Sequence, residues 1–444
     1  MLSHRPFRCA FPASRPVEYM KVPTAPGDVS NLVRPPASLR HSFAWTLAGN
    51  VVYGGSQWVL LSLIAKLGDS EMLGRYALAV ALTTPVAMLS HLNLRAVLAT
   101  DVERRHLFGD YVAARWSTTA ASLVIIALIA MLYGRAGAAS LGVLILLVGF
   151  SLSLENISDI YYGALQRRER MDVIAKSMIG RGLLTALMLG AALWLTGDLL
   201  VAVAALALVR VVVLAVYDVR AGSSGEDRSS TGWRAQRAIL WTALPLGAVL
   251  MFVSLTANVP RYAIERYLGT RELGAFAAVA AFIAAGNTLV NALGQSATPR
   301  LARYFSAPDV REFRKLALRL TALAVIAGVA GVAGAALLGK PILRIAYRPE
   351  YVELHGLLVA LMAAGTFGYV AITLGYLITS ARSFAVQMPL LACVAAVCAI
   401  ASWRLVPAMG LFGAALALGL AGGVQIAGAV LLLRRALRQQ ERPA

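Results

Sequence analysis

Two neighbouring apolar segments of the sequence carry side chains that hydrocarbon does not solvate. Glu155, Asn156 and Asp159 lie in the first segment, and Lys176 and Arg181 lie in the second. Ionisable groups inside a membrane are costly, so they usually pair with one another or mark the path of a substrate or an ion. The chemistry open to these residue types is ion pairing, binding of a charged group and proton transfer.

The spacing of these charges fits an antiparallel pair of helices. The polar turn between the two segments centres near residue 168, so Glu155 lies thirteen residues before it and Arg181 lies thirteen residues after it. Asp159 and Lys176 lie nine before and eight after. Positions equidistant from a turn lie at equal depth, which predicts the ion pairs Glu155–Arg181 and Asp159–Lys176. In a second interpretation, which stays open, these residues bind substrate or carry a coupling proton or sodium ion.

The elements that must position these residues are membrane-spanning helices. The chain is 59% hydrophobic and only 14% charged, against about 45 to 50% apolar and about 25% charged in soluble domains. A bilayer core needs about 20 apolar residues per helix, and twelve such segments follow one another, which predicts an all-α integral membrane protein. The predicted spans lie near residues 43–65, 74–95, 112–133, 138–165, 173–196, 198–217, 239–260, 273–297, 316–338, 352–379, 384–406 and 410–433.

A repeated phrase divides the twelve spans into two sets of six. Residues 67–77 return about 200 positions later as residues 268–277, one residue shorter, and each copy links the first two spans of its set. This repeat predicts two homologous six-helix lobes with the same orientation. The predicted organisation is a disordered cytoplasmic tail at 1–40, an amino-terminal lobe at 41–217, a linker at 218–237, a carboxyl-terminal lobe at 238–435 and a cytoplasmic tail at 436–444.

The repeat aligns polar positions between the two predicted lobes. With an offset of 200 residues, His91 aligns with Asn291, and Arg95 aligns with Gln295. Asn287 precedes Asn291 by four residues and Gln295 by eight, so these three residues share one helix face. With an offset of 201 residues, Gln57 matches Asn258, and Asn50, Tyr53 and Gln57 form a polar stripe on the first span. Packing through interhelical hydrogen bonds and lining of a cavity both explain such stripes.

Two further arginines lie inside or close to predicted spans. Arg210 is about seven residues from the end of its span and has no obvious partner. Two interpretations are open: its guanidinium reaches the membrane interface, or it faces an inner cavity and meets an anionic group. Arg261 precedes Glu265 by four residues, a spacing that predicts an ion pair.

The net charge of +19 reflects membrane topology. Most of the 41 Lys and Arg residues lie at the two ends of the chain and in the even-numbered loops, so the positive-inside rule places both termini in the cytoplasm. This distribution argues against a nucleic-acid partner. Residues 309–316 alternate charged and apolar side chains and are predicted to form a short amphipathic helix on the cytoplasmic surface.

Residues for catalysis or for metal binding do not cluster in the sequence. The three cysteines, Cys9, Cys393 and Cys398, form neither a metal-ligand pattern nor a disulfide framework, and the five histidines are scattered. We therefore predict no catalytic residue, no metal site and no cofactor.

Several further passages stand out beside the repeated phrase at 67–77 and 268–277. They are Asn93–Arg95 with Ala99–Asp101, Gly294–Ala302 and Ile342–Tyr351. Together these passages resemble the polysaccharide transporter family of Wzx-type flippases, a branch of the superfamily that also holds the multidrug MATE exporters and the lipid II flippase. The resemblance extends over roughly residues 41–435. It departs from the lipid II branch, because the sequence has twelve spans rather than fourteen and no arginine inside the first span.

The resemblance implies a V-shaped pair of helix bundles that alternates between inward-open and outward-open states. The implied cargo is an undecaprenyl-diphosphate-linked oligosaccharide, moved from the cytoplasmic to the periplasmic leaflet of the bacterial inner membrane during O-antigen or exopolysaccharide assembly, with a polymerase among the expected partners. A diphosphate needs cationic partners inside the membrane, so Arg95, Arg181 and Arg210 are the candidate cavity cations. Glu155 and Asp159 are the candidates for coupling to a proton or sodium ion.

Two alternatives from other classes compete with this interpretation. A cation-coupled drug exporter of the MATE type would present acidic and aromatic residues to an organic cation, whereas the spans here carry arginines. A membrane enzyme of glycan assembly would need a catalytic site in a sizeable outer loop, and the predicted outer loops are short. The flippase interpretation is therefore preferred.

Overall fold

The structure of the protein is a computed structural model. It describes residues 39–101, 105–135, 139–227, 229–306, 310–380 and 384–440, which are almost entirely helical and contain no strand. The predicted tail at 1–40 lies outside the described residues, except for the first two residues of the first helix. Twelve helical segments are long and apolar enough to cross a membrane. The predicted all-α fold with twelve spans is confirmed.

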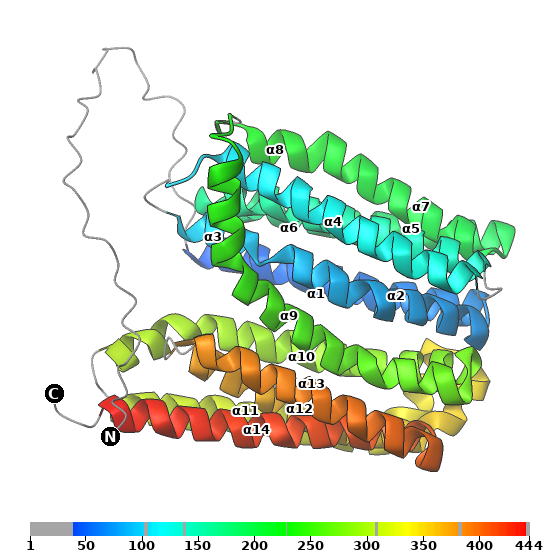
Figure 1. Cartoon of the computed structure of the whole chain (residues 1–444). Coiled ribbons are helices and arrows are strands. Elements are labelled where there is room, and N and C mark those ends of the chain that lie inside the picture. Colours follow the sequence, from blue (N-terminus) through cyan, green and yellow to red (C-terminus); the bar gives the residue numbers. More distant parts are fainter. Residues whose placement is uncertain are drawn as a thin grey trace, which may run out of the picture. The chain divides into compact units, whose positions relative to one another are not determined.

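The first six spans are built from the helices that precede residue 224, and the second span and the sixth span each contain a change of helix (Figure 1). They are α1 (Leu39–Leu67), α2 (Ser70–His91), α3 (Leu94–Thr100), α4 (Phe108–Arg135), α5 (Ala139–Arg167), α6 (Met171–Thr196), α7 (Leu199–Val213), the π turn η1 (Leu214–Asp218) and α8 (Val219–Ser223).

The last six spans begin with α9, which nine residues separate from the end of α8. They are α9 (Trp233–Leu268), α10 (Thr270–Ser306), α11 (Val310–Ala346), the 3₁₀ turn η2 (Pro349–Leu354) with α12 (His355–Ser380), α13 (Phe384–Met409) and α14 (Leu411–Gln440). Helix α14 therefore continues beyond residue 436, where the sequence predicts the start of a tail.

Local sequence signals explain where several helices start and stop. Asp69 caps α2 by accepting a hydrogen bond from the backbone N–H of Met72 at 2.7 Å, and Asp198 caps α7 in the same way through Leu200 at 2.7 Å. A capping carboxylate satisfies a donor that the helix itself leaves free. Helix α6 ends at Gly197, whose φ of 64° is accessible to glycine at little cost.

The second span is broken near one end. Leu92 and Asn93 both have φ near 50°, a left-handed conformation that residues with a side chain seldom adopt. The break ends α2 at His91 and starts α3 at Leu94 in a new direction. His91 and Arg95 consequently lie on either side of a fixed corner, which brings both side chains to α5.

The two copies of the repeated phrase lie directly against each other. A Cβ atom added to Gly74 would stand 1.8 Å from the carbonyl oxygen of Thr270, and one added to Gly274 would stand 1.8 Å from the carbonyl oxygen of Ser70. The contact is reciprocal, as expected when equivalent parts of a repeat meet. Ser70 also exchanges a hydrogen bond with the hydroxyl of Tyr351 at 3.0 Å. Only glycine fits at both central positions.

Helix α9 bends along its length, so that its first part crosses the helices of the first half before the rest runs beside α10 (Figure 1). Pro245 and Pro260 lie inside this helix, and proline removes a hydrogen-bond donor from the helical ladder. The buried side chains of Ile239 and Ala243 pack in one cluster with residues of α3, α4 and α5. The beginning of α9 thus contributes to the core of the first half.

The segment predicted as a linker, 218–237, is shorter and more firmly held than its composition indicates. The sixth span continues to Ser223, and only residues 224–232 separate it from α9. Glu226 accepts a hydrogen bond from Arg167 at 2.6 Å. The buried Asp110 accepts hydrogen bonds from the hydroxyl of Thr231 at 2.9 Å and from its backbone N–H at 2.7 Å. These carboxylates tie the connection to the ends of α4 and α5.

The predicted surface helix at 309–316 is not a separate element. Asp309 lies outside the described residues, and the remainder forms the first turns of α11, which continues without interruption to Ala346. Phe313 is buried, whereas Glu312 and Lys315 are exposed and pair at 3.2 Å. The amphipathic pattern therefore marks the end of a long helix where it leaves the apolar layer.

Candidate functional site

The charged side chains predicted from the sequence gather around α5. Glu155 and Asp159 are four residues apart and share one helix face. Helices α2, α3 and α7 direct basic side chains to these two carboxylates, and α4 and α6 add one arginine each to the surrounding cluster. The predicted clustering is therefore observed, although the predicted pairing is wrong.

Glu155 pairs with Arg210 and not with Arg181. The distance from Arg210 Nη1 to Glu155 Oε2 is 3.1 Å, and the Tyr53 hydroxyl donates a hydrogen bond to the other carboxylate oxygen. The Arg210 side chain is 6% exposed, whereas Glu155 is 29% exposed. Arg210 therefore has a partner that the sequence did not indicate, and Glu155 is the member of the pair that solvent or a ligand can reach.

Arg181 pairs with Asp218 from the π turn. Arg181 Nη2 lies 2.5 Å from Asp218 Oδ2, and Ser177 donates a hydrogen bond to Asp218 Oδ1 at 2.5 Å. Arg181 also donates to the hydroxyl of Tyr162 at 2.9 Å. Both members of the ion pair are almost fully buried, at 3% and 0% exposed. Asp218 lies one residue beyond the predicted end of the sixth span at 217, so it was not among the charged residues predicted inside the membrane.

Asp159 pairs with the corner of the second span and not with Lys176. Its Oδ2 atom lies 3.0 Å from His91 Nε2, and its Oδ1 atom lies 3.2 Å from Arg95 Nη1. Arg95 also donates from Nε to Gln166 at 2.8 Å. Lys176 instead lies over the ring of Trp45, with 5.5 Å between its Nζ atom and the ring centroid. The predicted pairs do not form because α5 and α6 turn their charged side chains toward other elements and not toward each other.

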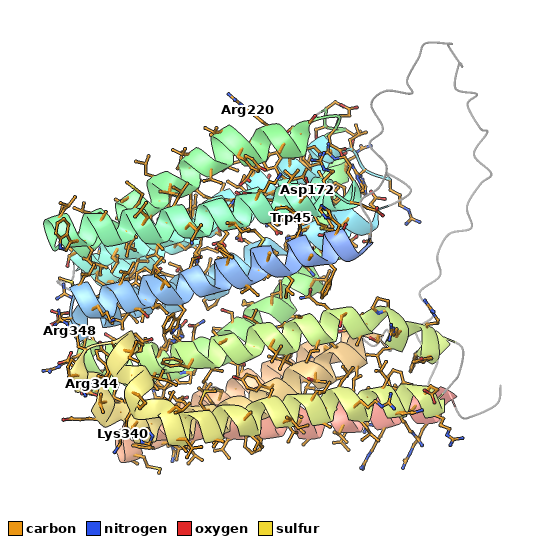
Figure 2. The ribbon with its side chains drawn as sticks, turned by 180° about the vertical axis from the view of Figure 1, so that it is seen from behind. Trp45, Asp172, Arg220, Lys340, Arg344 and Arg348 are labelled. Carbon is orange, nitrogen blue, oxygen red and sulfur yellow. The ribbon has the colours of Figure 1, made fainter. Side chains whose placement is uncertain are left out.

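Figure 2 labels Trp45 of α1 and Asp172 of α6 near the same end of the bundle, which is the end where both helices begin. Lys340, Arg344 and Arg348 are labelled at the other end, where α11 finishes. Arg348 donates a hydrogen bond to the backbone carbonyl of Lys66 at 3.2 Å. This contact fixes the end of α11 against the end of α1, close to the paired glycines.

Arg115 on α4 is a further buried cation, which was not among the predicted site residues. Its side chain is 0% exposed, and Nη1 donates to the backbone carbonyl of Ser90 at 3.1 Å. Its Nε and Nη2 atoms have no hydrogen-bond partner among the described residues. The signal was present, because residue 115 lies inside the predicted span 112–133. A buried guanidinium with free donors has capacity for an additional acceptor.

The second half contributes neutral polar groups. Asn258 is buried, accepts a hydrogen bond from Arg261 at 2.9 Å and donates to Ser254 at 2.9 Å. The structure therefore gives Arg261 a partner three residues earlier, in place of the predicted Glu265. Asn291 accepts a hydrogen bond from the hydroxyl of Tyr376 at 3.0 Å.

The remaining stripe residues differ in their surroundings. Asn291 donates to the backbone carbonyl of Asn287 at 2.8 Å, and Gln295 is exposed. Gln57 on α1 is half-buried, and its Nε2 atom has no partner among the described residues. Tyr53 of the α1 stripe thus reaches Glu155 in the charged cluster, whereas no hydrogen bond or ion pair among the described residues joins Gln57 or the α10 stripe to that cluster.

The charged cluster has an excess of positive charge. Counted over the described contacts, it holds the guanidinium groups of four arginines and the carboxylates of three acidic residues, with His91 as a further group that can gain a proton. The arginines are Arg95, Arg115, Arg181 and Arg210, and the acidic residues are Glu155, Asp159 and Asp218. Such an arrangement suits an anionic ligand better than a cationic one.

The buried pair Arg181–Asp218 yields a direct stability test. Arg181→Gln or Asp218→Asn alone strands the other charge in a buried site, which typically costs about 3–5 kcal/mol. We expect either single variant to unfold at a clearly lower temperature in detergent, and the double variant to unfold at a higher temperature than both. Arg170→Gln, which breaks the exposed pair of Arg170 with Asp172, is the matched control and should have little effect. A double variant no more stable than the singles would refute the pairing.

The family model described as "Polysaccharide biosynthesis protein" matches residues 39–305, more than half of the chain. The chain belongs to this family. A capsular polysaccharide biosynthesis protein, CapF of Staphylococcus aureus, is 23% identical over 382 residues, which cover 84% of this chain and 94% of CapF. The resemblance to Wzx-type polysaccharide flippases is thereby confirmed.

Solved structures with this fold include transporters and a flippase. An inward-facing multidrug resistance MATE family transporter of the MOP superfamily is 12% identical, with a TM-score of 0.69 over 88% of this chain and 94% of that chain. The lipid II flippase MurJ in an inward closed conformation is 11% identical, with a TM-score of 0.70 over 90% of each chain. The MATE transporter VcmN of Vibrio cholerae is 16% identical, with a TM-score of 0.66 over 90% of this chain and 96% of that chain. At these identities the likeness concerns the fold.

Proposed function

We propose that this member of the polysaccharide biosynthesis family translocates an undecaprenyl-diphosphate-linked oligosaccharide from the cytoplasmic to the periplasmic leaflet of the bacterial inner membrane, for O-antigen or exopolysaccharide assembly. Family membership and fold support a transport role in glycan assembly. The observation that carries the choice of cargo is the cluster around α5, where four arginines accompany three carboxylates. A diphosphate brings the negative charge that balances this excess.

Exposure ranks the candidate cations within the cluster. Arg95 is 29% exposed, whereas Arg181, paired with Asp218, and Arg210, paired with Glu155, are only 3% and 6% exposed. Arg95 is therefore the cation that first meets the phosphates, and Arg181 mainly maintains the helix packing. Arg210 becomes available when Glu155 is neutralised.

Glu155 is the candidate for energy coupling. Protonation of its carboxyl group would remove the charge that holds Arg210 and would leave that guanidinium free for a phosphate. Loss of the proton would restore the pair and expel the cargo. A sodium ion at the carboxylate would have the same effect, so both ions remain within the proposal. Glu155→Gln, which mimics the protonated state, should bind cargo without releasing it.

The topology in this proposal follows the distribution of basic residues, with both termini in the cytoplasm. The paired glycines Gly74 and Gly274 then lie at the periplasmic end, and their contact must open before the cargo leaves. A polymerase that receives the translocated oligosaccharide is the expected functional partner on that side.

Deletion of the gene in its host tests the proposed function. We expect the undecaprenyl-diphosphate-linked oligosaccharide to accumulate in lipid extracts and the surface glycan to disappear, because the intermediate is made but not moved. Unchanged lipid intermediates, together with new sensitivity to cationic drugs, would contradict the proposal and favour an exporter of the MATE type. Expression of the intact gene in the deletion strain is the control.

A further inference from the structure

An apolar groove lies between the beginning of α9 and the helices α2 and α4. It encloses about 510 Å³, a volume within the range of about 300–1,000 Å³ typical of small-molecule sites. Its walls include Leu89 of α2, Ile125 of α4 and Leu244 of α9. The backbone of Gly247 closes against α2, since an added Cβ would stand 2.6 Å from the carbonyl oxygen of Leu89. The groove is therefore a seam between the first half of the chain and the first helix of the second half.

The hydroxyl groups in the groove already donate hydrogen bonds within the protein and do not need a polar ligand. Ser90 donates its hydroxyl to the backbone of Ala87 at 2.9 Å, and Ser122 donates to the backbone of Thr119 at 2.8 Å. Thr118 likewise donates to a carbonyl of its own helix, at 3.0 Å. Because these donors are already satisfied, the groove favours a hydrocarbon ligand.

One face of α9 provides a cation between two aromatic rings beside this groove. Trp233, Arg237 and Trp241 are four residues apart, so they share one helix face, and all three line the groove. The tryptophans are 62% and 63% exposed. No hydrogen bond or ion pair is found for Arg237 within the described part of the chain. Tryptophan and arginine are the residue types that settle at the interface of apolar chains and phosphate groups.

The groove and the charged cluster share one stretch of α2. Ser90 and Leu92 line the groove, while His91 between them turns to Asp159. The buried Arg115 donates to the carbonyl of Ser90 from the neighbouring helix. A molecule with a long apolar chain and a phosphate can thus place its chain in the groove and its charged end near the cluster.

We propose that this groove holds the isoprenoid chain of the lipid carrier next to its diphosphate while the sugar is translocated, an inference that rests on the proposed function. The position of the groove at a seam between the halves, beside the cationic cluster, favours the carrier of the cargo over a bulk phospholipid. Arg237 attracts the phosphate as the carrier enters from the membrane. The chain then remains in apolar surroundings while the polar part crosses.

Photocrosslinking in membranes of the host tests this assignment. A photoreactive amino acid replaces Leu244 in the groove or, as a matched control, Leu187 on α6, an exposed leucine at 65%. After irradiation, mass spectrometry identifies the lipid attached to each variant. We expect polyprenyl diphosphate adducts at Leu244 to exceed those at Leu187 by about tenfold, a ratio that corresponds to about 1.4 kcal/mol. Phospholipid adducts alone, in similar yield at both positions, would overturn the assignment.

A variant in which the groove is blocked distinguishes two outcomes: the groove assignment is wrong, or the proposed function is wrong. Leu244→Trp should reduce translocation of the long-chain carrier in proteoliposomes by about tenfold, yet leave translocation of a short-chain farnesyl diphosphate analogue close to that of the parent protein. Equal translocation of the long-chain carrier by both proteins would contradict the groove assignment and leave the function intact. A parent protein that moves neither lipid would contradict the proposed function, and this inference with it.

Discussion

Arg95→Ala is expected to lower translocation of a diphosphate-linked lipid by at least about tenfold, with a normal amount of protein in the membrane. A charge-assisted hydrogen bond typically contributes about 1.5–3 kcal/mol, and about 1.4 kcal/mol corresponds to a factor of ten. Arg95 is the most exposed arginine of the cluster, and Asp159 engages only one end of its guanidinium. The measurement is the initial rate of lipid translocation in proteoliposomes containing equal amounts of each variant.

Two controls separate loss of cargo binding from loss of structure. Lys176→Ala removes a cation of the same half that lies on Trp45, away from Asp159, and should leave the rate unchanged. The double variant Arg95→Ala with Asp159→Asn removes the carboxylate that the single change partly strands. If cargo binding is lost, the double variant stays inactive. Recovery of translocation in the double variant would show instead that Arg95 acts only as a structural partner.

Gly74→Ala and Gly274→Ala are expected to prevent the two halves from meeting at the repeated phrase. Each added methyl group would collide with a backbone carbonyl, at 1.8 Å, and a backbone cannot rotate aside as a flexible side chain can. Overpacking of this kind typically costs about 1–3 kcal/mol. Because the proposed transport cycle requires this contact to open and close, the variants should accumulate in the state open at this end and lose most translocation.

Accessibility of a single cysteine measures the state of this contact. Ser70→Cys is introduced into a protein without the native cysteines. Its thiol should react faster with a membrane-impermeant maleimide in the presence of Gly274→Ala than in its absence. Gly55→Ala is the matched control, since an added Cβ there meets nothing within 4 Å. Unchanged labelling with normal translocation in the Gly274 variant would show that the paired glycines do not gate transport.

The sequence predicted the fold well because hydropathy alone determines most of it. Backbone groups in hydrocarbon must bond internally, so a run of apolar residues has few alternatives to a helix. All twelve segments were found for that reason, whereas the contact between the two copies of the repeat at Gly74 and Gly274 was not predicted. The ends of the helices were less predictable, because spans such as the sixth continue beyond the apolar run to Ser223.

The pairing of charges was not predictable from one hairpin. Glu155 and Arg181 have equal depth on adjacent helices, yet each is bound by a third element, Arg210 on α7 and Asp218 in the π turn. The corner at Leu92 and Asn93 directs His91 and Arg95 to Asp159. The local composition does not predict a left-handed backbone at two consecutive residues that are not glycine. Depth follows from sequence position, whereas the direction of a side chain around a helix depends on packing.

Translocation of two lipids by the purified protein in proteoliposomes tests the central claim, that a cationic cluster around α5 receives an anionic lipid-linked glycan. One lipid carries the oligosaccharide on a polyprenyl diphosphate, and the other carries the same oligosaccharide on the same chain through an uncharged linkage. The account predicts rapid translocation of the diphosphate lipid, slow translocation of the uncharged lipid, and loss of that difference in Arg95→Ala. Equal translocation of both lipids by the unaltered protein would contradict it.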